Sequence, residues 1–128
     1  MTERRPPLLL DSIAHINDTA RDRVVVSGSH GGVSAAQFVL DAPHAPRLVM
    51  FNDAGVGKDQ AGIAALAMLQ AAGIACACYR HDSACIGQAQ DALTHGVIGH
   101  VNPAAQALGV RVGDKVAQWA SHGLGHAA

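Results

Sequence analysis

The sequence predicts a three-layer α/β domain, Rossmann-like or flavodoxin-like, with a mainly parallel sheet of four or five strands. Strand-like and helix-like segments alternate along the chain, which is typical of consecutive βαβ units. The central strand candidates at 24–27 and 47–51 are apolar without polar alternation, as in strands covered on both faces. The length of 128 residues fits one core. We therefore expect a single domain over 1–128, frayed at 1–6 and 121–128.

Local composition assigns each element in turn. Apolar or β-branched runs predict strands at 6–12, 22–29, 46–53, 74–79 and 97–101. Runs of helix-forming residues predict helices at 31–43, 58–73, 86–96, 103–108 and 113–123, with a weak helix or connection at 13–21. The helix at 58–73 is the strongest of these, because Asp59 lies in its first turn and Gly73 follows its end.

Charge is unusually scarce in this chain. Charged residues make up 15% of it, against about a quarter of a typical soluble domain. The segment 61–72 carries no charge, and a helix that is apolar all round is normally buried all round. We therefore expect a homo-oligomer formed through the 59–72 helix. The net charge of −1 gives no attraction to nucleic acid or to a membrane surface, and no apolar run is long enough for a spanning helix, so we expect neither partner.

The three cysteines fall within ten residues of one another, at Cys76, Cys78 and Cys85. This spacing suits free thiols in the cytoplasm better than a disulfide framework. With His81 they could be soft metal ligands, but two cysteines on one strand face are more typical of a buried core, so we expect no metal and no cofactor. Cys85 lies beyond the strand and remains an alternative nucleophile.

Residues with reactive side chains follow the predicted strands. In a parallel sheet, ligands bind outside the carboxyl ends of the strands, where loops and helix N-termini meet. The polar residues that follow the strands are Asp11, Ser12, Ser29, His30, Asn52, Asp53, Lys58, Arg80, His81, Asp82, Ser83, His100 and Asn102. The sequence therefore predicts a site for a small molecule at this edge.

The segment SGSHGG at 27–32 has three interpretations. Gly28, Gly31 and Gly32 let the backbone approach a ligand, so their amides could form an anion or oxyanion cradle. The segment differs by one residue from the nucleophile elbow G-x-S-x-G, which would make Ser29 a nucleophile. It could also be a tight strand-to-helix turn. The glycine spacing does not fit the dinucleotide fingerprint G-x-G-x-x-G.

The segment FNDAGVGKD at 51–59 lacks the first glycine and the Ser or Thr of a P-loop, so nucleotide triphosphate binding is not expected. Asp53 at the end of a buried strand could orient His30 from the neighbouring loop, or it could form an Asx-turn. Lys58 and Arg80 are the cations available to hold a carboxylate.

A His-Gly pair after an apolar strand, followed by a second apolar strand, resembles the caspase-like cysteine peptidases. Ala54 and Gly55 stand where that family would place its catalytic cysteine, so the resemblance does not imply peptidase activity. The segments SGSHGG, NDAGVGKDQAGIAALAML and GVIGHVN together resemble an uncharacterised bacterial family of small α/β proteins, which implies no particular activity.

These observations favour a small-molecule enzyme, hydrolase- or lyase-like, acting on a polar, anionic substrate. Its catalytic residues would be His30 as acid/base, Asp53 as its orienting group and Ser29, with the amides of 28–32 as oxyanion donors. Its substrate-binding residues would be Gly28, Gly31, Gly32, Asn52, Lys58, Arg80, His81, Ser83 and His100. The alternative is a non-catalytic ligand-binding or assembly subunit that uses the same edge, because no catalytic motif is complete.

Overall fold

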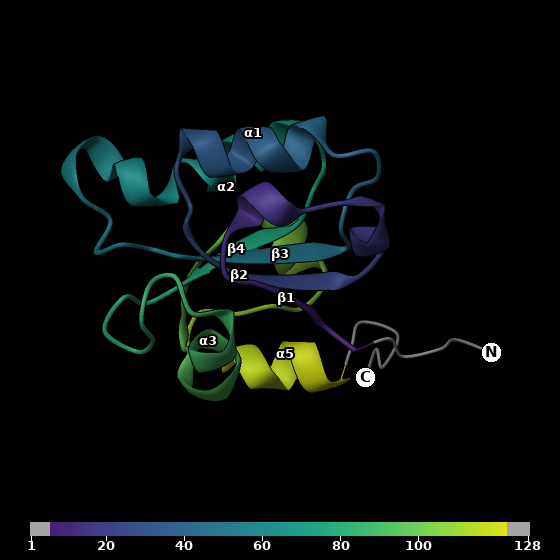
Figure 1. Cartoon of the computed structure of the whole chain (residues 1–128). Coiled ribbons are helices and arrows are strands. Elements are labelled where there is room, and N and C mark those ends of the chain that lie inside the picture. The colour runs from purple at the N-terminus through teal and green to yellow at the C-terminus, as the bar shows by residue number, and fades with distance from the viewer. Residues whose placement is uncertain (1–5, 123–128) are drawn as a thin grey trace.

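The computed structural model describes residues 6–122, in which five strands form one sheet in the order β1-β2-β3-β4-β5 (Figure 1). The strands are β1 (Leu8–Leu10), β2 (Val24–His30), β3 (Leu48–Asn52), β4 (Cys76–Tyr79) and β5 (Ile98–Val101). Strands β1 to β4 are parallel, and β5 is antiparallel to β4. The predicted α/β fold with a mainly parallel five-stranded sheet is confirmed.

Helices cover both faces of this sheet. The α-helices are α1 (Val33–Asp41), α2 (Ala65–Ala71), α3 (Ala89–His95), α4 (Pro103–Ala107) and α5 (Val116–His122). Short 3-10 helices lie at η1 (Ile13–His15), η2 (Asp18–Ala20) and η3 (Lys58–Ile63). Helices α1 and α2 pack on one face and α3 and α5 on the other, which gives the three layers (Figure 1). None of the described helices is long and apolar enough to cross a membrane.

The strand order follows the order in the sequence, because successive crossovers on one face advance the chain in one direction. The sheet therefore lacks the reversal of strand order that forms the binding crevice of doubly wound folds. Any site at the carboxyl edge must be built from other features. In this chain the antiparallel direction of β5 is such a feature, because it brings the start of β5 beside the end of β4.

The core is divided by the sheet into two clusters. Alternate residues of each strand point to opposite faces, so Val24 and Val26 pack towards α3 and α5, whereas Val25 packs towards α1 and α2. The central strands β3 and β4 are buried at every position. This two-sided burial explains why the strands show no polar alternation in the sequence.

The predicted helix at 58–73 is wrong as one continuous element. It is divided into η3 and α2, because Asp59 and Gln60 have left-handed φ angles of 55° and 59°. Gly62 packs so closely on the end of β3 that a side chain there would overlap the Asp53 carbonyl, and its amide donates to Val56 O at 2.7 Å. The chain is thus held against the end of the strand before a regular helix can begin.

The expected frayed ends fall mostly on residues 1–5 and 123–128, which lie outside the described residues. At the first described residue, the Pro6 carbonyl accepts hydrogen bonds from Arg23 Nε and Nη2 at 3.2 and 2.8 Å. Ser121 and His122 form the end of α5.

Asn102 connects several elements at the edge of the sheet where β4 begins and β5 ends. Its side chain is buried, and its Oδ1 accepts from the amides of Cys76 at 3.0 Å and Ala105 at 2.9 Å. Its Nδ2 donates to the carbonyls of Leu66 at 3.2 Å and Ile74 at 3.0 Å. One amide group therefore satisfies backbone groups of β4, α2, α4 and the α2–β4 connection.

Replacing this residue, Asn102→Ala, is expected to lower the free energy of unfolding by about 3 kcal/mol or more, because it leaves two buried amides without an acceptor. The matched control Asn17→Ala removes an exposed acceptor for the Thr19 amide, which costs about 1 kcal/mol. Urea unfolding followed by circular dichroism measures both values. Equal losses in the two variants would contradict this role for Asn102.

Candidate functional site

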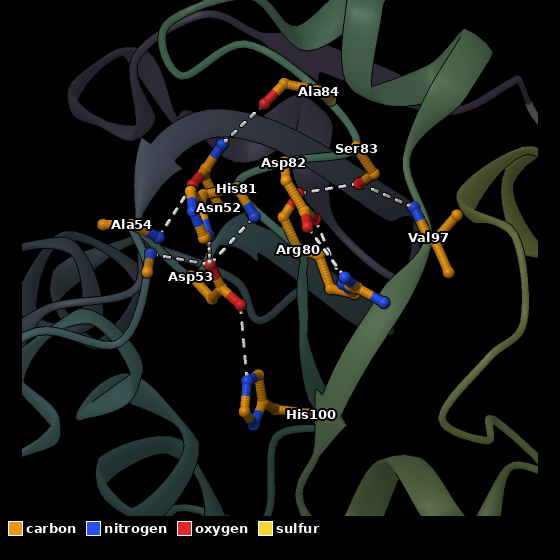
Figure 2. Close-up of polar contacts among 11 residues, drawn as sticks. Asn52, Asp53, Ala54, Arg80, His81, Asp82, Ser83, Ala84, Val97 and His100 are labelled. Carbon is orange, nitrogen blue, oxygen red and sulfur yellow. Dashed lines mark hydrogen bonds and ion pairs between the residues drawn. The ribbon is translucent and has the colours of Figure 1, made fainter.

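An open pocket of about 360 Å³ lies where the carboxyl ends of β3 and β4 meet the start of β5. Its lining residues are Asp53, Gly55, Val56, Arg80, His81, Asp82, Val97, Ile98, Gly99, His100, Val112 and Gly113. Four residues singled out in the sequence are therefore brought together here: Asp53, Arg80, His81 and His100. Figure 2 shows the two histidines approaching the Asp53 carboxylate from different sides.

Asp53 is the most buried charged group of the pocket, with its side chain 6% exposed. Its Oδ1 accepts from the amides of Gly55 at 2.8 Å and His81 at 2.9 Å. Burying a carboxylate is unfavourable unless donors compensate for the lost water, and these two amides do so. Because both donors are backbone groups, the carboxylate is fixed in position by the fold.

His81 is oriented by this carboxylate. Its Nδ1 lies 3.3 Å from Asp53 Oδ1, and an ionised carboxylate can only accept, so this contact requires a proton on Nδ1 (Figure 2). In the neutral imidazole, Nε2 then carries the free lone pair. The side chain is 58% exposed, and a Cβ at Gly55 would lie 3.5 Å from the ring. Since that distance is an ordinary van der Waals contact, the ring is open to a ligand because of its own exposure.

His100 approaches the other carboxylate oxygen. Its Nε2 lies 3.3 Å from Asp53 Oδ2, and its side chain is 31% exposed. The expectation that His100 and Asn102 both lie at the carboxyl edge was wrong for Asn102. Because β5 is antiparallel, its last residues run to the opposite edge, where Asn102 meets Cys76.

Arg80 lies beside the pocket in an ion pair with Asp82. Its Nε and Nη2 donate to the two oxygens of Asp82 at 3.0 and 2.7 Å (Figure 2). These hydrogen bonds raise the pKa of the guanidinium and lower that of the Asp82 carboxyl from their ordinary values. Ser83 has a structural role instead, since its Oγ donates to Arg80 O and accepts from Val97 N.

The loop after Asp53 has an unusual backbone. Ala54, Val56, Asp59 and Gln60 all have φ between 52° and 69°, a region that costs a residue with a side chain about 1–3 kcal/mol. The side chains that stabilise its start are Asn52, which accepts from Ala54 N at 2.7 Å, and Asp53. The Asx-turn interpretation of these two residues is therefore correct, and for Asp53 it coexists with the contacts to the histidines.

Lys58 and Asn52 lie outside the pocket lining. Lys58 is exposed in η3. Asn52 is buried, and its Nδ2 donates to Ala84 O at 3.2 Å, so the side chain is fully used in holding the β4–α3 loop.

The glycines of SGSHGG are explained by close packing. A Cβ at Gly28 would lie 2.6 Å from Gln88 N, and one at Gly31 would lie 2.9 Å from Cys78 Sγ. Gly32 precedes α1 as its N-cap. The expected cradle of amides at 28–32 is not available, because the amides of Ser29, Gly31 and Gly32 donate to Ser27 Oγ, Asn52 O and His30 O. These contacts support the turn interpretation.

Ser29 and His30 are not placed as a catalytic pair with Asp53. Ser29 Oγ accepts from Ile13 N at 3.0 Å, which ties β2 to η1. The His30 side chain is exposed and makes no hydrogen bond or ion pair within residues 6–122. The expected partner of Asp53 is thus corrected from His30 to His81 and His100, because His30 at the end of β2 is not among the residues that line the pocket.

The cysteines do not converge with His81. Cys76 and Cys78 are buried under α1 and α2, whereas Cys85 is exposed at the β4–α3 loop. His81 and His100 approach different oxygens of Asp53. Across residues 6–122, no group of three His, Cys, Asp or Glu side chains is arranged to hold a metal ion.

Sequence reasoning missed the apolar walls of the pocket. Val56, Val97 and Val112 come from three separate segments, and Val112 is 62% exposed despite its size. In a single sequence, a valine in a short loop beside a glycine does not indicate that it lines a pocket. The alternation in Ile98-Gly99-His100 gives no signal either, because the register shifts within β5: Ile98 pairs with Tyr79, whereas His100 pairs with Cys78 of the opposite face.

Compared with protein-family models, curated proteins and solved structures, the chain matches none. The fold and pocket thus define it as a small α/β protein with a buried aspartate between two histidines.

The loop that carries Cys85 is held by Asp91, and this gives a pH-dependent prediction. Hydrogen bonds from the Cys85 amide at 2.7 Å and from His95 Nδ1 at 2.9 Å lower the pKa of Asp91. The stabilisation is therefore present above the unfolded-state pKa of about 3.9 and is lost as the pH falls through the lower folded-state value. Asp91→Asn is expected to lower Tm by roughly 2–4 °C at neutral pH.

The difference in Tm between wild type and Asp91→Asn should disappear in strong acid. Thermal unfolding at a series of pH values measures it, with Asp18→Asn as the control, because the Asp18 side chain makes no hydrogen bond or ion pair with the described residues. A Tm difference that persists in strong acid would show that the loss is not electrostatic.

Proposed function

We propose that this chain is a small-molecule enzyme, hydrolase- or lyase-like, whose acid–base group is His81 and whose orienting group is Asp53. The observation that carries the proposal is the buried Asp53 carboxylate in contact with two histidines beside an open pocket. A carboxylate that fixes the tautomer of an exposed imidazole is the arrangement that general-base catalysis needs. Several titratable groups in one pocket add support.

We propose direct attack by water, without a covalent intermediate on the chain. None of the described lining residues carries a hydroxyl, a thiol or an amine. In a hydrolysis, His81 Nε2 takes a proton from water while the water oxygen bonds to the substrate carbon. The bond to the leaving group breaks with its electron pair, and the proton passes from His81 to that group, while Asp53 stays ionised. Arg80 lines the pocket, and Asp82 neutralises its guanidinium through two hydrogen bonds.

Hydrolysis of 4-nitrophenyl acetate tests the assignment of the acid–base group. His81→Gln is expected to lower the rate by about 100-fold, the usual contribution of a general base. The control His30→Gln is expected to retain the wild-type rate, since His30 lies outside the pocket lining. If His30→Gln loses activity and His81→Gln retains it, the acid–base role belongs to His30 in the glycine-rich turn and not to His81. Equal rates in all three proteins would favour a non-catalytic ligand-binding subunit.

We also propose that two copies associate through α2. Ala67 and Ala71 of α2 and Ala61 of the preceding η3 are exposed. Leu66 and Ala67 border an open apolar groove of about 510 Å³. Ala67→Glu, which places a charge in that groove, is expected to convert the assembly to a monomer of about 13 kDa. Light scattering measures the mass of both proteins. A wild-type monomer at micromolar concentration would refute the proposal.

We propose that this chain is located in the cytoplasm. Its three cysteines are free, and a reducing compartment preserves free thiols.

A further inference from the structure

The two oxygens of the Asp53 carboxylate have different surroundings. Oδ1 receives the amides of Gly55 and His81 and the Nδ1 of His81. Oδ2 accepts no hydrogen bond from the described residues, and its nearest polar neighbour is His100 Nε2 at 3.3 Å. Oδ1 is therefore saturated, whereas Oδ2 retains its capacity to accept.

Oδ2 is also reachable. Within the described residues no side-chain nitrogen or oxygen is both sealed from solvent and without a hydrogen-bond partner, so Oδ2 must open to the pocket that Asp53 lines. Glycine at position 99 keeps this approach clear. A Cβ there would lie 2.8 Å from Arg80 Cγ and 4.0 Å from Oδ2. A side chain at 99 would thus displace Arg80 and narrow the path to the carboxylate.

We infer that the pocket binds a small aliphatic alcohol, with the ligand hydroxyl lying beside Asp53 Oδ2 and His100 Nε2 and within hydrogen-bond distance of both. This inference rests on the proposed function, because it places the ligand in the same pocket. A hydroxyl matches both neighbours, since its proton goes to the carboxylate and its oxygen accepts from an Nε2–H. The contact between Nε2 and an ionised carboxylate favours that proton on His100 Nε2.

The walls of the pocket determine the rest of the ligand. Val56, Val97 and Val112 surround the polar end and offer apolar surface to a short branched carbon chain. Such a ligand is uncharged and needs no cation, and Asp82 already neutralises Arg80 through two hydrogen bonds. A ligand with a carboxylate as its head group would instead place its negative charge beside Asp53 Oδ2, which is repulsive.

Four probes that share one carbon skeleton test the head group: 3-methyl-1-butanol, its methyl ether, 3-methylbutanoate and 3-methyl-1-butylamine. Trp119, the single tryptophan, reports binding. Its Nε1 donates to Asp114 Oδ2 at 2.8 Å, and Asp114 follows the pocket residues Val112 and Gly113. The alcohol is expected to bind at least about tenfold more tightly than the ether, because the ether cannot donate to the carboxylate. Titrations monitored by the Trp119 indole NMR signal give the four dissociation constants.

Two variants separate the contribution of the ligand head group to affinity from that of its carbon chain. His100→Gln is expected to reduce the preference for alcohol over ether, and it avoids the folding risk of changing Asp53. Val112→Ser is expected to weaken alcohol and ether alike, by roughly threefold, and to leave their ratio unchanged. Lys58→Gln, outside the pocket lining, is the control that should change neither value.

Tighter binding of the carboxylate or the amine, equal binding of alcohol and ether, or no binding of any probe would each overturn the inference. These results are distinguishable from failure of the proposed function. A preference for the carboxylate combined with an inactive His81→Gln variant removes only the hydroxyl assignment. A preference for the alcohol combined with an active His81→Gln variant keeps the binding site and removes the catalytic role of His81.

Discussion

Burial of the Asp53 carboxylate is the constraint on which the pocket end of this molecule depends. A charge at the end of a buried strand is tolerated only when hydrogen-bond donors replace the water it loses. The amides of Gly55 and His81 supply that replacement, so the two loops after β3 and β4 must converge on one point. The left-handed backbone around Ala54 is the conformational cost of that convergence.

The same constraint explains why the pocket is polar at its base and apolar at its sides. With Oδ1 occupied by the β3 and β4 loops, the other oxygen and His100 face the space beside β5. The reversal at β5 then brings a third segment to the edge, and the 109–115 loop is attached to β5 through Gly113 N to Ile98 O at 2.7 Å and Ile98 N to Asp114 O at 2.8 Å. Valines from these connections complete the walls.

The glycine-rich turn has a different origin from the pocket. Its glycines allow β2 to pass against the loop at 87–88 and against Cys78, and its amides are used within the fold. Ligand-binding turns and tight packing turns both require residues without a Cβ, so composition alone cannot separate them. In this chain the polar side chain that the sequence favoured, His30, lies on the packing turn at the end of β2. The histidines that meet Asp53 lie two and three strands further along, after β4 and on β5.

The sequence by itself determined the fold class and most strands, because apolar β-branched runs such as 24–26 leave few alternatives to a buried strand. It also predicted that Asp53, Arg80, His81 and His100 lie at one edge of the sheet, since residues that follow strands gather there, and all four line the pocket. Only the tertiary structure decided which histidines meet Asp53, that Asn102 lies at the opposite edge, and that the 58–73 helix is broken. Each of these depends on strand direction or on contacts between distant segments, whose energies a local pattern does not contain.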